Sequence, residues 1–115
     1  MTGNIFEKII RKEIPKDFRY EDDDIVAFDD IHPLAPVHVL ILPKKPIQSV
    51  AALADEDALL IGKIHLVARD LARELGIEES GYRLVTNIGS NGGQEVPHLH
   101  FHLLGGKPLG SKICS

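Results

Sequence analysis

The sequence predicts a single domain built from both helices and β-strands. Residues 96–104 alternate histidines with apolar residues, as side chains alternate across the two faces of a strand. Residues 55–75 carry apolar side chains at helical spacing. Residues 37–42 are apolar apart from one histidine, which is typical of a buried strand. With 115 residues in all, these patterns indicate one globular domain.

A short helix is predicted near the N-terminus. Asn4 and Glu7 have the spacing of a capping box, and the apolar residues that follow Asn4 share one helical face. The helix must end by Ile14, because Pro15 disfavours helix in the residue before it. The acidic run 21–24 is interpreted as a solvated turn, because it lacks the glycine and the alternation of a calcium loop.

Two strands are predicted next, at residues 25–28 and 37–42. The intervening residues 29–36 are rich in turn formers and predict a constrained loop. His38 is the one polar side chain in the second strand. Two interpretations of it are open: a buried neutral histidine with a hydrogen-bond partner, or a fourth member of a histidine cluster.

A long amphipathic helix is predicted over residues 55–75. Three acidic residues at its start suit the positive end of a helix dipole, and Gly76 is a natural stop. His65 lies within this helix beside polar neighbours and is interpreted as an ordinary surface residue. A further strand is predicted at residues 82–87.

The last predicted strand carries the histidines. Pro97 and Gly105 mark its two ends. In this strand His98, His100 and His102 line one face, and the apolar residues between them line the face toward the core. Imidazole acts as base, acid, metal ligand or nucleophile, so the alternation favours a chemical site over a solvated surface.

A metal site is the less favoured interpretation of these histidines. Same-face neighbours on a strand lie about 6.6 Å apart, which allows two of them to bind one zinc ion, but the outer pair is about 13 Å apart. Further ligands would have to come from elsewhere. The only cysteine, Cys114, has no Cys-x-x-Cys partner.

The glycine-rich connection at residues 89–94 is a candidate phosphate cradle. Glycine lets backbone N–H groups approach an anion closely, and Asn87 and Gln94 add side-chain donors. The spacing is not that of a P-loop or of a dinucleotide-binding motif, so neither function is predicted.

Composition narrows the function further. The sequence has no apolar run of the roughly 20 residues that a membrane span requires and no secretory signal, which predicts a soluble cytoplasmic protein. A single cysteine rules out an intramolecular disulfide framework. The net charge of −4 argues against a protein that binds nucleic acid over a broad surface.

Residues 98–104 fit every position of the signature His-φ-His-φ-His-φ-φ, where φ denotes an apolar residue. In this respect the chain resembles the histidine-triad (HIT) family of nucleotide-binding proteins. The resemblance covers nearly the whole chain in order, through residues 5–15, 27–31, 35–38, 42–45 and 87–106. The Gly-Gly-Gln segment and the Leu-Leu-Gly-Gly ending are similar to the Hint branch rather than to the dinucleoside-polyphosphate branch.

The resemblance implies an α+β fold with a five-stranded antiparallel sheet, one short N-terminal helix and one long helix. It implies one HIT domain over residues 1–115, with a short flexible tail from about residue 107. It also implies a homodimer in which the two sheets join into one of ten strands, with the long helix at the interface.

The activity implied is metal-independent hydrolysis of purine nucleoside phosphoramidates through a covalent nucleotidyl-histidine, without a cofactor. In this reading His100 is the nucleophile, His102 hydrogen-bonds the phosphate or leaving group, and His98 and His38 orient the other two. Two alternatives are kept. One is a nucleotide-binding regulatory or scaffold protein with little turnover, and the other is a zinc-dependent metallohydrolase.

The same resemblance implies a set of nucleotide-binding residues. Asp30 would accept hydrogen bonds from the ribose, with Ile31 beside it. The residues expected near the phosphate are Asn87, Gly93, Gln94 and Glu95. Some relatives carry a small hydroxyl residue at the place of Glu95, so its backbone N–H is the expected contact there. The apolar residues expected around the base are Ile5, Phe6, Ile9, Ile14 and Phe28.

Overall fold

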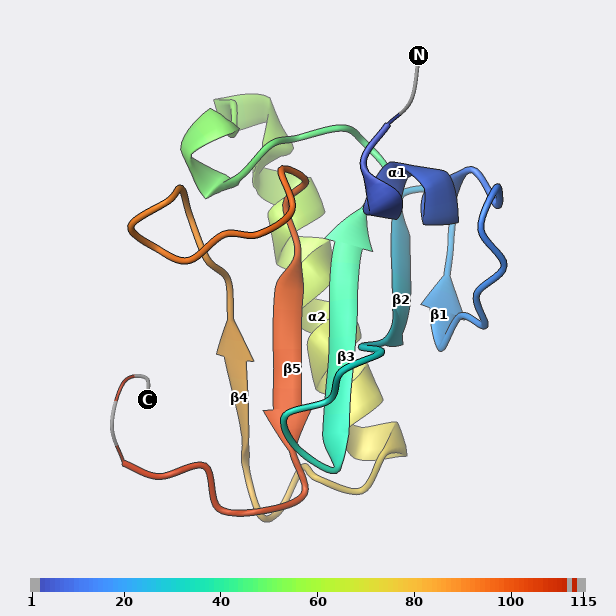
Figure 1. Cartoon of the computed structure of the whole chain (residues 1–115). Coiled ribbons are helices and arrows are strands. Elements are labelled where there is room, and N and C mark those ends of the chain that lie inside the picture. The colour runs from blue at the N-terminus through green and yellow to red at the C-terminus, as the bar shows by residue number, and fades with distance from the viewer. Residues whose placement is uncertain (1–2, 112, 114–115) are drawn as a thin grey trace.

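A five-stranded antiparallel sheet with one helix on each face forms the architecture of the computed structural model, which describes residues 3–111 and 113 (Figure 1). The strand order is β1-β2-β3-β5-β4. The helices and strands are α1 (Ile5–Ile10), β1 (Tyr20–Glu21), β2 (Ile25–Asp29), β3 (Val37–Pro43), α2 (Ala58–Glu74), β4 (Tyr82–Val85) and β5 (Phe101–Gly105). Two 3₁₀ turns, Val50–Ala52 and Asp55–Asp57, precede α2.

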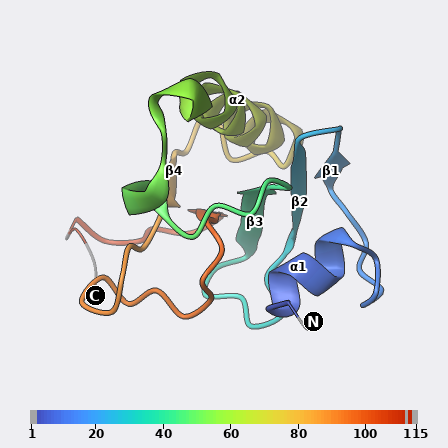
Figure 2. The same ribbon diagram turned by 90° about the horizontal axis from the view of Figure 1, so that it is seen from above.

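The alternation of side chains along the strands gives the sheet two different faces, which Figure 2 shows from above with α2 on one side and α1 on the other. Buried residues of α2 pack on one face, on a set that includes Ile41, Leu99 and Leu103. On the other face Phe6 and Ile9 of α1 cover a smaller apolar cluster, whose strand residues are Val26, Phe28, Leu40 and Leu42. The smaller cluster leaves room on that face for a site.

The predicted capping box of α1 is confirmed. The Asn4 side chain accepts a hydrogen bond from the Glu7 N–H, and the Glu7 carboxylate accepts one from the Asn4 N–H, both at 2.9 Å. The helix ends at Ile10, and Lys12 takes a positive φ of 64° as the chain turns away. It therefore ends a full turn before Pro15 would force it to.

The predicted long helix begins as a 3₁₀ turn, where the buried Asp57 side chain bonds to the residues before the helix and to Lys45. Its carboxylate accepts hydrogen bonds from the Ala54 N–H at 2.9 Å and from Lys45 Nζ at 2.5 Å. Regular α-helix starts at Ala58. No helix within residues 3–111 has both the length and the apolar character needed to cross a membrane.

Two differences from the expected strands concern the sheet. The two-residue strand β1 was not expected, because its exposed residues have no apolar periodicity; its pairing with β2 defines it. The histidine strand pairs only from Phe101 onward, opposite Ile41. Before that point the chain leaves the ladder and is held by other bonds, including one from the Leu99 N–H to the Ile47 carbonyl at 2.7 Å.

Candidate active site

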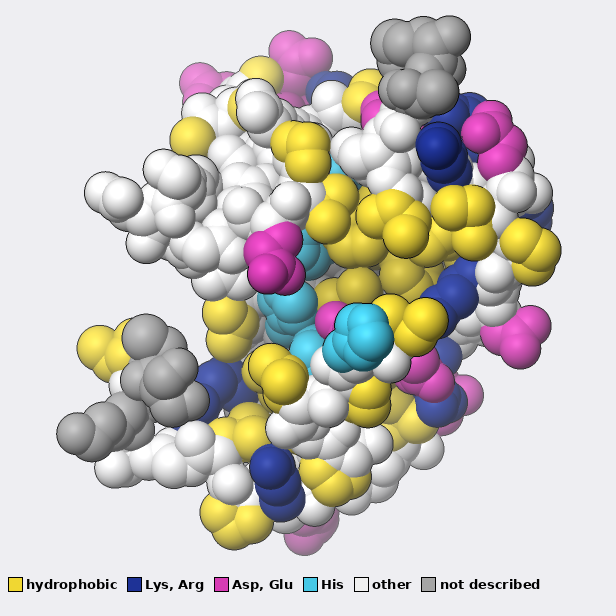
Figure 3. Space-filling view, viewed as in Figure 1, with side chains coloured by type: hydrophobic (Ala, Val, Ile, Leu, Met, Phe, Trp, Pro, Cys, Tyr) yellow, Lys and Arg dark blue, Asp and Glu magenta, His cyan; other side chains and the backbone are white. Residues whose placement is uncertain are grey.

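Three histidines, His38, His100 and His102, gather on the α1 face of the sheet, where Figure 3 shows histidine side chains beside an apolar surface. Although β5 begins only at Phe101, the alternation is kept, so His100 and His102 share this face with ring centroids 5.1 Å apart. His38 of β3 joins them, with its ring centroid 5.1 Å from that of His102. His38 is therefore both a buried histidine and a member of the cluster.

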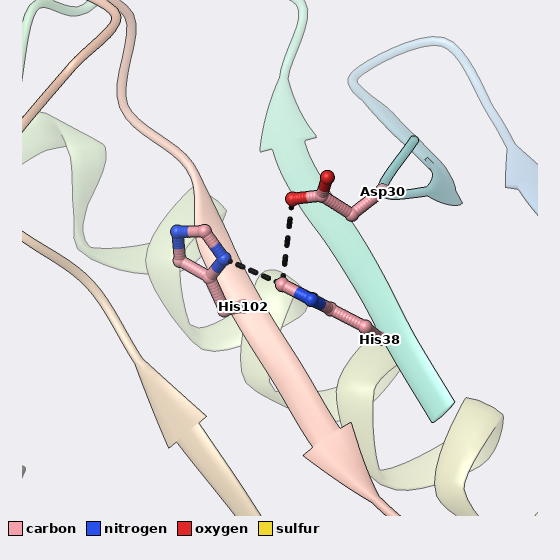
Figure 4. Close-up of side chains that lie close together, drawn as sticks. All are labelled: Asp30, His38 and His102. Carbon is pink, nitrogen blue, oxygen red and sulfur yellow. Dashed lines mark hydrogen bonds and ion pairs between the residues drawn. The ribbon is translucent and has the colours of Figure 1, made fainter. Parts of the chain in front are cut away.

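The hydrogen bonds of His38 fix the protons of two rings. The Leu34 N–H donates to His38 Nδ1 at 3.1 Å, so this nitrogen carries a lone pair and the proton lies on Nε2. His38 Nε2 lies 2.8 Å from His102 Nδ1, to which it donates (Figure 4). His102 then carries its own proton on Nε2, as a donor available to a ligand.

The same reasoning assigns the tautomers of the other two histidines. His98 Nε2 lies 2.7 Å from the Pro43 carbonyl, and His100 Nδ1 lies 2.7 Å from the His98 carbonyl. A carbonyl only accepts, so both nitrogens carry protons and His100 Nε2 is left with a lone pair. Among the described residues every buried side-chain nitrogen or oxygen has a partner. Since His100 Nε2 has none, it faces the solvent side of the site.

Burial keeps three of the site's imidazoles, those of His38, His98 and His102, neutral. Burial, with smaller contributions from the neighbouring His100 and His38, lowers the pKa of His102 to about 4, against the opposing effect of Asp30. Burial also lowers the pKa of His38, with Asp30 opposing. The pKa of His98 is lowered by burial too, although its bond to the Pro43 carbonyl opposes the shift. At neutral pH these three rings are uncharged.

These pKa shifts predict a loss of stability in mild acid. Below about pH 6.5 the unfolded chain protonates His38, His98 and His102 while the folded chain resists their protonation, so their contribution to stability is complete above that pH and falls toward pH 4. His102 alone contributes a loss of about 1 kcal/mol at pH 5.5. Urea unfolding at pH 7.5 and 5.5 measures this, and His102→Gln should show a smaller difference. Equal midpoints at both pH values in the unmodified chain would refute it.

Asp30 lies directly beside the histidines, just beyond β2 (Figure 4). One of its carboxylate oxygens accepts from the His32 N–H at 2.8 Å, and the other lies 3.5 Å from His38 Nε2. The next residue, Ile31, is 77% exposed. The expected ribose contacts are thus at the edge of the histidine cluster, where a ligand has access to them.

Asp30, His38 and His102 also bring potential metal-ligand atoms within 4.8 Å of one another. However, the His38 Nε2 proton lies in the hydrogen bond to His102 Nδ1. A metal ion would need a lone pair on both nitrogens, so it would have to displace that proton. The arrangement of Asp30, His38 and His102 therefore fits a hydrogen-bonded row of side chains better than a metal centre.

The expected phosphate donors are mostly used to close their own loop. The Asn87 amide donates to the Gly92 carbonyl at 2.7 Å, and the Gly93 N–H donates to the Ser90 carbonyl at 3.1 Å. The Gln94 amide donates to two carbonyls, those of Gln48 and Val96. These three residues shape the loop. Among the described residues the Glu95 N–H donates to no group of the chain, which leaves it open to an anion.

The residues expected around the base divide into two layers. Ile9 and Ile14 line a hollow of about 300 Å³ together with Phe18. The sequence analysis did not predict Phe18 as a pocket residue, because the segment around it is polar. Phe6 and Phe28 are buried beneath, and the Phe6 ring stands edge-on to the His100 ring with centroids 4.8 Å apart. Ile5 lies outside both layers and is 52% exposed, so it is the base-pocket residue least supported by the geometry.

The remaining sequence candidates lie away from the cluster. His65 is exposed on α2, on the opposite side of the sheet, which confirms its interpretation as a surface residue. The first part of the expected tail is held by Arg83, which donates to the Leu109 and Gly110 carbonyls at 3.3 and 2.6 Å. Cys114 lies outside the described residues.

The sequence model of the HIT domain family matches residues 11–109 of this chain. The chain belongs to the HIT family. It is 51% identical over 110 residues to the purine nucleoside phosphoramidase of Escherichia coli strain K12, which covers 96% of this chain and 92% of that protein. A HIT family hydrolase from Clostridium thermocellum matches with 48% identity and a TM-score of 0.94, over 98% of both chains.

A second solved HIT family hydrolase, from Legionella pneumophila, matches with 48% identity and a TM-score of 0.90, over 92% of this chain and 95% of that one. These similarities confirm the expected HIT fold, and they agree with the observed five-stranded antiparallel sheet and long helix. The residues that the sequence missed in the site are mostly backbone groups, such as the Leu34 N–H and the Pro43 carbonyl, which no side-chain pattern reveals.

Proposed function

We propose that this HIT protein hydrolyses purine nucleoside phosphoramidates, releasing an amine and a nucleoside monophosphate. The observation that carries the proposal is the 2.7 Å hydrogen bond between His100 Nδ1 and the His98 carbonyl, which orients the ring and leaves Nε2 without a partner among the described residues. The 51% identity to the Escherichia coli purine nucleoside phosphoramidase supports the same substrate class. A neutral imidazole with a free lone pair is a nucleophile ready to attack phosphorus.

The first step forms a bond between His100 Nε2 and the α-phosphorus while the phosphorus–nitrogen bond breaks. The amine leaves with the bonding pair and takes a proton from water. The His100 ring becomes positively charged in the adduct, and its Nδ1–H bond to the His98 carbonyl stabilises that charge. His102 Nε2–H donates to a phosphate oxygen or to the leaving nitrogen.

In the second step water attacks the phosphorus and the bond to His100 breaks. The water oxygen joins the nucleoside monophosphate, a proton passes to the solvent, and His100 returns to its neutral form with the proton still on Nδ1. Because the ring keeps this proton throughout, its orientation is the same for both steps. Dividing the reaction in this way replaces one difficult displacement by two easier ones.

The proposed substrate contacts use the expected residues, except that the phosphate is bound by the Glu95 N–H and not by Asn87, Gly93 and Gln94. Asp30 accepts from the ribose hydroxyls, with Ile31 against the sugar. The α-phosphate meets the Glu95 N–H in front of the loop that Asn87, Gly93 and Gln94 shape. The base lies against Ile9, Ile14 and the neighbouring apolar residues Ile5, Phe6 and Phe28. The apolar set supports this placement because its Phe6 ring contacts His100.

The test is incubation of the purified protein with an adenosine phosphoramidate in the presence of EDTA. We expect release of the amine and AMP at a rate that the chelator does not change, because every step uses side chains of the chain itself. Activity that disappears with EDTA and returns with zinc would instead select a metallohydrolase. AMP binding without turnover of any phosphoramidate would select a binding or scaffold protein.

We also propose that the protein is a homodimer. Helix α2 exposes Leu59 (78%) and Leu66 (50%), and Gly62 lies between them with open space where a Cβ would stand. A glycine within a helix costs roughly 0.5–1 kcal/mol of stability relative to alanine, and close approach of a second helix explains its use here.

Strand β4 is a sheet edge, so a partner's β4 can extend the sheet. Two chains of 12.7 kDa give roughly 25 kDa, which sedimentation equilibrium measures.

A further inference from the structure

Two lysines with different surroundings line the hollow beside α1. The hollow of about 300 Å³ is lined by Ile9, Lys12, Ile14, Pro15, Lys16, Asp17 and Phe18. Lys12 is paired with Glu21, its Nζ lying 3.2 Å from the carboxylate. Lys16 forms no ion pair among the described residues, although it is half-buried. Its ammonium lies 5.7 Å from the centre of the Phe28 ring, so it stands over the apolar floor.

Aromatic rings connect this ammonium to the reacting histidine. The Phe28 ring centroid lies 5.9 Å from that of Phe6, and the Phe6 ring centroid lies 4.8 Å from that of His100. A nucleotide with its phosphate at His100 and its base against Ile9 and Ile14, which line the hollow, therefore brings the edge of the base toward Lys16. An apolar surface running from the histidines toward α1 is visible in Figure 3.

We propose that Lys16 determines base preference and that it favours 6-oxopurines such as guanine over adenine. An ammonium group only donates hydrogen bonds. Guanine presents two acceptors on one edge, O6 and N7, whereas adenine replaces the first with an amino group that is itself a donor. Asp17, which lines the same hollow, accepts from amino groups that both purines carry, so it does not discriminate in the same way.

This inference rests on the proposed function, so two readouts separate it from that function. The first is the ratio of kcat/KM for guanosine and adenosine phosphoramidates that share one leaving amine. The second is the ratio of Kd for GMP and AMP, which needs no turnover. In Lys16→Met we expect each preference for guanine to fall about tenfold, because a charged donor is lost from a partly desolvated site.

Two further variants control the comparison. Lys16→Arg keeps a cationic donor and should keep most of the guanine preference. Lys12→Met removes the lysine of the same hollow that is already paired with Glu21, and the two ratios should stay at their original values. Circular dichroism checks that each variant is folded.

The outcomes are distinct. If the unmodified protein hydrolyses neither substrate, the proposed function fails, while the Kd ratio still decides the role of Lys16. Unchanged ratios in Lys16→Met, or equal changes in Lys12→Met, would overturn the inference. So would an unmodified protein that prefers adenine or binds neither nucleotide.

Discussion

Replacing His100 by alanine should lower turnover of a purine nucleoside phosphoramidate by at least about 10³-fold while leaving the fold intact. The lone pair on His100 Nε2 faces solvent, and the bond of the opposite ring nitrogen to the His98 carbonyl orients it. His102 Nδ1 cannot replace it, because this nitrogen accepts the proton of His38 Nε2. Steady-state assays with a fluorogenic phosphoramidate measure the loss.

The variant's nucleotide affinity should change little, because Asp30 and the apolar pocket are untouched. His65→Ala is the matched control, since it removes an exposed histidine on the opposite side of the sheet. We expect that control to turn over substrate at the rate of the unmodified protein. Turnover by His100→Ala within a few fold of the original rate would show that another group attacks the phosphorus.

His98→Ala should give the largest loss of stability among the histidine variants, roughly 3 kcal/mol. The side chain is only 1% exposed, and its Nε2–H satisfies the Pro43 carbonyl at 2.7 Å. Alanine leaves a cavity and a buried carbonyl without its donor. Urea unfolding at pH 7.5 measures the change, because acid destabilisation does not contribute there.

The same variant should lower kcat more than it raises KM for the phosphoramidate. The His98 backbone carbonyl orients His100, and removing the ring that fixes this residue lets the carbonyl move. His98→Gln carries an amide that can donate to the Pro43 carbonyl, so it should recover part of both losses. A stability loss below about 1 kcal/mol, or a His98→Gln protein no better than the alanine variant, would contradict this role.

Sequence reasoning predicted the histidine face because strand alternation depends only on residue order. It placed His100 and His102 on one face correctly, even though the paired strand starts at Phe101 and the preceding residues lie outside the ladder. The role of His38 was left open, because strand order was needed to decide it. Strand β3 pairs with β5, and this neighbour relation brings His38 Nε2 to His102 Nδ1.

The parts that sequence could not predict depend on backbone groups and on contacts between distant segments. The tautomers follow from the Leu34 N–H and from the carbonyls of Pro43 and His98, none of which has a side-chain signature. The sequence predicted a phosphate site at the glycine-rich loop, but the inward bonds of Asn87 and Gln94 depend on the conformation that the loop adopts. The sequence analysis did not predict Lys16 and Phe18 as pocket residues, because the segment that contains them is polar. Only the fold brings this segment against α1.

The most direct test of the account is rapid-quench intact-mass spectrometry of the protein during turnover of an adenosine phosphoramidate. The account predicts a transient mass increase equal to one adenylyl group, located on the peptide that contains His100 and lost as AMP is released. His65→Ala should show the same adduct, and His100→Ala should not. Rapid release of AMP with no adduct at any quench time, or an adduct on a different histidine, would contradict nucleophilic attack by His100.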